Sequence, residues 1–219
     1  MERETDSAGA WGASQGAIPS RRAARWLPLL ALPYALLVAW LLARQADLPG
    51  LLHDDGVYVA MARGIEQGLG PIDTHLGADA RTARFPPLYP LVLAATRRLL
   101  GVAPDGVAGS SRWVALNGLF LGVAGATFLH WLLAWRRVAP LVALAVTAAA
   151  FTAPTLLGLS QHLMSEPLFL ALLVVALWLH ERALGNGAPA PGRARTVAAA
   201  LVIGLLPATR TLGAAALLA

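Results

Sequence analysis

The chain has 219 residues, of which 57% are hydrophobic and only 13% are charged. Soluble domains carry about twice that share of charged residues, and disordered chains contain few apolar ones. The composition therefore predicts an integral membrane protein. The net charge of +5 comes from arginines beside apolar segments and does not indicate a nucleic-acid-binding face. The absence of cysteine excludes a disulfide framework, a thiolate zinc site and a cysteine nucleophile.

Apolar segments recur along the chain at residues 26–43, 113–135, 138–159, about 163–179, and from 197 onward. A bilayer core of about 30 Å is crossed by roughly 20 helical residues, so each segment is a candidate span. The first one follows Arg21, Arg22 and Arg25 and lacks a convincing cleavage site, which is typical of a signal anchor. The expected fold class is an all-α polytopic membrane protein with about five transmembrane helices.

The charges between these segments predict their orientation. Arginines lie before the first segment, between the second and third, and between the fourth and fifth, and the positive-inside rule makes that side cytoplasmic. Residues 1–25 are then a disordered cytoplasmic tail, and residues 26–219 form one transmembrane domain. We expect the protein in a bacterial cytoplasmic membrane, with its first outward loop at about residues 44–112. The last segment has no flanking charge, so we expect an N-terminal portion truncated at residue 219.

The outward loop is too rich in proline and polar residues to span, so we expect short interfacial helices in it. One lies in the string HDDGVYVAMARGIEQGLG, where Asp54 or Asp55 can cap a helix that ends at glycines 68–70. Its apolar side chains are expected to lie against the membrane: Val57, Val59, Met61 and Ile65. Alternatively, one of the two adjacent carboxylates serves as a general base, because their charges repel each other. The spacing leaves both interpretations open.

Four strings, taken in order, resemble a known family: HDDGVYVAMARGIEQGLG, FPPLYPLVLAATRRLLG, SEPLFLALLVVALWL and LPATRTLG. They are similar to the N-terminal half of the GT-C class of polytopic glycosyltransferases, in the branch of protein mannosyltransferase-like and lipid A aminoarabinose transferase-like enzymes. The resemblance covers residues 26–219 and implies a GT-C-like fold. It also implies that Asp54 and Asp55 are catalytic, with Asp54 as the leading residue and Asp55 in the place usually held by Glu.

The resemblance further implies a polyprenyl-phosphate-linked sugar as donor. Arginine binds phosphate oxygens through its forked guanidinium, which makes Arg63 and Arg84 candidates for the donor phosphate. Either arginine can instead pair with lipid phosphate or a nearby carboxylate at the membrane surface. Tyr58 and Tyr89 are candidates for hydrogen bonds to sugar or phosphate, although tyrosine is also favoured at the bilayer interface.

Three further residues are candidates for the site. Arg210 follows Pro207 in the last apolar segment and is expected either to contact the donor lipid in a polar environment or to reach the outer interface. Glu166 is a candidate substrate-binding residue. With His162 at the i and i+4 positions of one helix, it is also a weak candidate for a divalent metal. The alternative is that Ser165 caps a helix with Glu166 in its first turn.

The resemblance implies an inverting membrane glycosyltransferase that uses a loop Asp as general base on the extracytoplasmic face. The expected partners are the polyprenyl-phosphate-sugar donor, a lipid, glycan or protein acceptor, and membrane lipids, with no nucleic acid. No cofactor is predicted, and a divalent metal is possible. The alternative is a non-enzymatic polytopic membrane protein, either transporter-like or a scaffold, or an inactive fragment.

Overall fold

The computed structural model describes residues 23–44, 53–72, 85–101, 107–184 and 193–210. The regular elements of these ranges are all helices: α1 (Ala23–Ala43), α2 (His53–Glu66), α3 (Leu88–Leu100), α4 (Val107–Ala134), α5 (Pro140–Phe151), α6 (Pro154–Gln161), α7 (Glu166–Leu184) and α8 (Arg193–Thr209). The expectation of an all-α protein is confirmed for this part of the chain. The proposed tail at residues 1–25 lies almost entirely outside the described residues.

Helix α4 is the central element, because α1, α5, α6 and α7 all pack against it. Its contact with α1 is made by small residues: Gly118 lies against Ala39, and Gly122 lies against Ala35. The pairing runs in opposite directions along the two helices, so α1 and α4 are antiparallel. A Cβ atom at Gly118 would lie 2.7 Å from the backbone nitrogen of Ala39, and one at Gly122 would overlap Ala35. Small residues at this spacing let two helix backbones approach closely.

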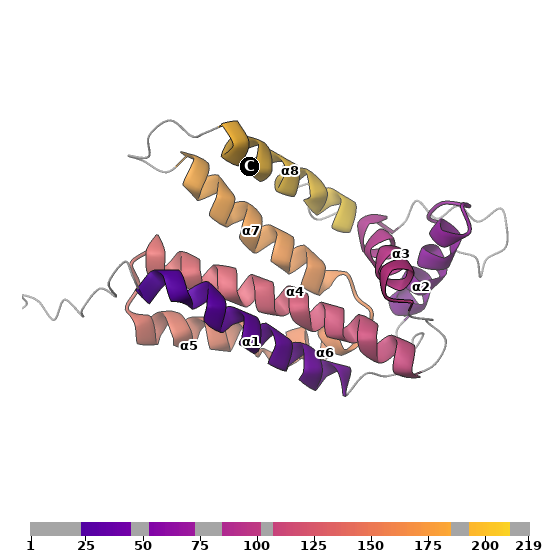
Figure 1. Cartoon of the computed structure of the whole chain (residues 1–219), viewed down its shortest axis with the longest axis horizontal. Helices are drawn as coiled ribbons and strands as arrows, with labels where there is room; N and C mark the ends of the chain where they lie inside the picture. The colour runs from indigo at the N-terminus through magenta and orange to yellow at the C-terminus, as the bar shows by residue number, and fades with distance from the viewer. Residues whose placement is uncertain (1–22, 45–52, 73–84, 102–106, 185–192, 211–219) are drawn as a thin grey trace, which may run out of the picture.

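The two short helices α2 and α3 pack on each other at one end of the longer helices (Figure 1). Helix α2 ends before Gly68 and Gly70, whose positive φ angles of 76° and 85° turn the chain as the sequence predicts. The expectation that its apolar residues lie against the membrane is wrong for Val57, Val59 and Met61. These side chains are buried inside the protein, with exposed fractions of 6%, 6% and 0%.

The apolar segment expected as one span at residues 138–159 is divided into α5 and α6, which are bent by 50° at their junction. Pro154 stands at the start of α6 and lacks the backbone N–H that a continuous helix would use there, so the helix breaks at this position. Among the described residues, Ser111–Ala134 within α4 is long and apolar enough to cross a membrane, and the bent pair adds a second candidate if it counts as one span.

Because α1 and α4 are in close contact, one methyl group added between them should strongly reduce the stability of the protein. Gly122→Ala should lower the free energy of unfolding by about 1–3 kcal/mol, because the added Cβ overlaps Ala35 and the helices must separate. The measurement is the thermal midpoint of the purified protein in detergent. Gly204→Ala is the matched control, since a Cβ at this position in α8 meets nothing within 4 Å and helix propensity improves. A Gly122→Ala variant as stable as the wild type would contradict this packing.

Candidate functional site

The first turn of α2 contains both predicted catalytic carboxylates, in different surroundings. Asp55 is only 1% exposed, and its Oδ1 accepts a hydrogen bond from the backbone N–H of Gly56 at 2.7 Å. Asp54 remains partly exposed. Carboxylates are favoured at this end of a helix, where backbone N–H groups lack helical partners. Asp55 therefore stabilises the turn, and Asp54 is the carboxylate that a solute can reach.

Tyr58 lies about one turn after this acidic pair and connects α2 to the α6–α7 junction. Its hydroxyl oxygen is 3.1 Å from the Ser165 hydroxyl oxygen, and either group can be the donor. Its ring makes edge contacts with Phe85 and Tyr89, with ring centroids 5.6 and 5.2 Å apart. With an exposed fraction of 5%, Tyr58 holds a fixed position in the protein.

Charged side chains from three separate segments act on Tyr58. Burial raises its pKa above the ordinary value of 10.0, and the hydrogen bond with Ser165 lowers it. The negative charges of Glu166 and Asp54 raise the pKa further, while the positive charge of Arg210 lowers it. Residues far apart in the sequence thus lie close together, at the start of α7 and the end of α8, which both point toward α2 and α3 (Figure 1).

Glu166 and Arg210 form an ion pair at this site, between Oε1 of the carboxylate and Nη1 of the guanidinium. Glu166 is the first residue of α7, and Arg210 directly follows the last residue of α8. The pair therefore holds the end of α8 beside the start of α7, and it gives Arg210 a counter-ion. Contact of Arg210 with a donor lipid stays a prediction.

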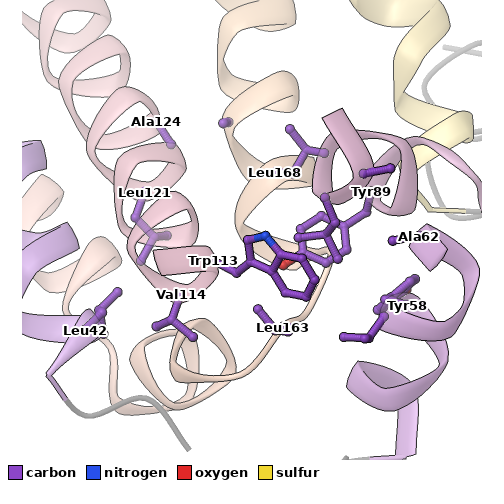
Figure 2. Packing of buried hydrophobic residues seen from close by; sticks show 14 of the residues in the cluster. Leu42, Tyr58, Ala62, Tyr89, Trp113, Val114, Leu121, Ala124, Leu163 and Leu168 are labelled. Carbon is purple, nitrogen blue, oxygen red and sulfur yellow. The ribbon is translucent and has the colours of Figure 1, made fainter. Parts of the chain in front are cut away.

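Tyr89 belongs to a buried hydrogen-bond chain that holds α3, α4 and α6 together. Its hydroxyl donates to Asn117 Oδ1 at 3.0 Å, and Asn117 Nδ2 donates to the backbone oxygen of His162 at 2.7 Å. Figure 2 shows Trp113 of α4 beside Tyr89 and Leu163 in the same cluster. Burial raises the pKa of Tyr89. Tyr89 therefore positions the site and does not present a free hydroxyl to a substrate.

Sequence reasoning missed Asn117 and the partner of Ser165. Asn117 is completely buried in a helix that is otherwise largely apolar, and that contrast is the signal that could have identified it. Ser165 was considered only as a helix cap. No local pattern indicates its contact with Tyr58, because the two residues are 107 positions apart.

The other predicted site residues have different outcomes. Arg63 is part of α2 and partly exposed. Next to it along the helix, Glu66 pairs with Arg97 of α3 at 2.8 Å, which joins the two short helices. Arg84 lies outside the residues that the structure describes.

The suggested metal pair does not share a helical face. Helix α6 ends at Gln161, His162 has an extended backbone, and α7 begins only at Glu166. The i and i+4 spacing of His162 and Glu166 therefore does not place their side chains on one face of a continuous helix. Within the described ranges, no group of three or more His, Asp or Glu residues is arranged to hold a metal ion.

Comparisons of the chain with protein-family models, with curated proteins and with solved structures find no match.

The environment of Tyr58 predicts a difference in tyrosine titration. Of the three tyrosines, Tyr58 should contribute little to the tyrosinate absorbance of the folded protein at pH 10, because burial and two nearby carboxylates raise its pKa. Tyr58→Phe should leave the tyrosinate absorbance of the folded protein nearly unchanged at that pH. In the unfolded protein, the same substitution should remove the absorbance of one tyrosine. An equal loss in both states would contradict the buried position.

The same shift predicts how stability depends on pH. The folded protein holds the Tyr58 proton more tightly than the unfolded chain, so this contribution to stability is complete below pH 10 and is lost as the pH rises further. Tyr58→Phe should therefore show a smaller loss of thermal stability above pH 10 than the wild type. An identical pH dependence for both proteins would be the contrary result.

Proposed function

We propose that this chain is part of a GT-C-like membrane glycosyltransferase that transfers a sugar from a polyprenyl-phosphate donor to a lipid, glycan or protein acceptor. The observation that supports this proposal most directly is the juxtaposition around Tyr58. Tyr58 of α2 contacts Ser165, which directly precedes Glu166 of α7. Glu166 pairs with Arg210 at the end of α8. Asp54 lies one helical turn before Tyr58 on α2. A base beside a phosphate-binding cation is what such a transfer requires.

The distribution of exposed apolar residues supports the proposed membrane location. Large hydrophobic side chains are exposed on α1, α5 and α8, including Trp40, Leu141 and Leu201 at 53%, 79% and 64%. Exposed apolar surface of this extent is costly in water and favourable in lipid. Arg136, Arg182 and Arg193 lie at helix ends away from the Tyr58 site, which supports placing that site on the extracytoplasmic side.

The proposed reaction uses Asp54 as the general base. A hydroxyl oxygen of the acceptor attacks the anomeric carbon of the donor sugar and loses its proton to the Asp54 carboxylate. The bond between the anomeric carbon and the phosphate oxygen breaks, and the phosphate leaves with the electron pair. Attack from the side opposite the leaving group inverts the anomeric configuration. Arg210 supplies the positive charge that stabilises the departing phosphate.

The difference between the two adjacent carboxylates supports Asp54 as the base. A general base must reach the proton of a bound hydroxyl, and Asp54 is the more exposed of the pair. Asp55 is buried and already accepts a backbone hydrogen bond, so we assign it to holding the turn.

Asp54→Asn tests this function. In membranes that contain the full-length gene product, the substitution should lower sugar transfer from a polyprenyl-phosphate donor at least about 100-fold, because an amide does not accept the proton. Glu66→Gln is the matched control, since it also neutralises a carboxylate on α2 but breaks only a surface pair with Arg97. Full transfer by Asp54→Asn at normal expression would reject the catalytic role and favour a non-enzymatic membrane protein.

A further inference from the structure

The ion pair between Glu166 and Arg210 leaves the carboxylate incompletely bonded within the described residues. The interaction joins one carboxylate oxygen, Oε1, to one guanidinium nitrogen, Nη1. Arginine and carboxylate prefer a fork in which two parallel hydrogen bonds form. Here Glu166 Oε2 is buried and has no hydrogen-bond partner among the described residues. An unpaired buried acceptor is unfavourable, so the pair is not an optimal structural lock.

The pair is also accessible. The side chains of Arg210 and Glu166 are 38% and 21% exposed, so an incoming group can reach the guanidinium. A guanidinium has five N–H donors, more than one carboxylate oxygen uses. A phosphate monoester offers several acceptor oxygens and up to two negative charges. It therefore competes strongly with the Glu166 carboxylate for those donors.

Helix α8, which ends just before Arg210, has an exposed apolar face. Val197, Leu201 and Leu205 are spaced four residues apart, which places them on one face of the helix, and their exposed fractions are 55%, 64% and 40%. Arg210 follows at the end of that helix. A ligand that combines an alkyl or isoprenyl chain with a terminal phosphate matches both features, with its chain along α8 and its phosphate at Arg210.

We propose that the phosphate group of a lipid monophosphate and the carboxylate of Glu166 compete for the guanidinium of Arg210. Glu166 therefore sets how tightly the lipid binds, and it is not merely a tether between α7 and α8. The identification of the lipid with the sugar donor rests on the proposed function, whereas the competition itself does not.

If the two groups compete, Glu166→Gln and Arg210→Gln should change the affinity for the lipid phosphate in opposite directions. The full-length protein is placed in phosphatidylcholine nanodiscs and titrated with farnesyl monophosphate, and the dissociation constant is followed by tryptophan fluorescence. Arg210→Gln should weaken binding about tenfold or more, because a charged hydrogen-bond donor is lost. Glu166→Gln should tighten binding about threefold, because the competing charge is removed.

Glu181→Gln is the matched control. Glu181 also pairs with an arginine, Arg136, but at the C-terminal ends of α7 and α4. Its substitution should leave the dissociation constant within about twofold of the wild-type value, since the pair is distant from Arg210. Thermal unfolding of each variant reports whether the helices still pack.

Either of two results would overturn the proposal: unchanged affinity in Arg210→Gln, or weakened affinity in Glu166→Gln. The second would show that the pair acts only as structure. If Glu166→Gln does not fold, Arg210→Lys replaces it. A retained positive charge should then keep more affinity than Arg210→Gln does, and equal affinity in these two variants would reject the role of the charge.

A parallel titration with phosphatidate distinguishes the two lipid sources of a phosphate monoester. Competition with either lipid supports the proposal, and the lipid that binds more tightly identifies the source. Because binding is measured without sugar transfer, its outcome is independent of the Asp54→Asn assay. If Asp54→Asn loses sugar transfer but Glu166→Gln does not bind the lipid more tightly, the proposed enzyme function stands and the proposed competition is rejected.

Discussion

A single buried amide fixes the part of the molecule where the candidate site lies. Asn117 of α4 accepts a hydrogen bond from Tyr89 of α3 and donates one to the backbone at the end of α6. The first bond positions the short helices α2 and α3, and the second positions the segment that leads into α7. Ser165 and Glu166 follow within four residues of that anchored backbone. The contacts of Tyr58 and Arg210 therefore depend on a polar group that the apolar helix α4 buries completely.

The site combines negative charge from two elements with one cation. Asp54 and Glu166 both act on Tyr58, and Arg210 opposes them from the end of α8. An anionic ligand can enter such a site only if the cation is available to it, which links the ion pair of Glu166 to the chemistry proposed for Asp54. In the proposal, the lipid chain lies along the exposed apolar face of α8. These properties are the basis for proposing a substrate with a lipid-linked phosphate.

Local sequence patterns predicted most helices but not their tertiary contacts. The string that begins at His53 predicts a short helix ended by glycines, and the structure contains α2 with that ending. The break at Pro154 was missed because the apolar composition continues through it, although proline interrupts the backbone hydrogen bonds. The burial of Met61 was missed for a related reason. Periodicity identifies an apolar face but does not distinguish lipid from protein as the surface that covers it.

The candidate residues were predicted one at a time, and only the fold brings them together. Tyr58 and Ser165 are 107 positions apart, and Glu166 and Arg210 are 44 apart, so no short motif encodes either contact. The spacing of His162 and Glu166 was misleading because the chain is not helical between them. Packing of separate helices, which depends on side-chain shape over long sequence distances, determines these contacts.

The central claim is that segments from α2, α7 and α8 form one site for a lipid-linked phosphate. Photocrosslinking of the full-length protein with a diazirine-bearing isoprenyl monophosphate, followed by peptide mapping, tests it most directly. The account predicts that labels concentrate near Asp54, near Glu166 and around Arg210, and that excess unlabelled lipid phosphate removes them. Labels distributed evenly over the exposed apolar helices, or unaffected by the competitor, would contradict it.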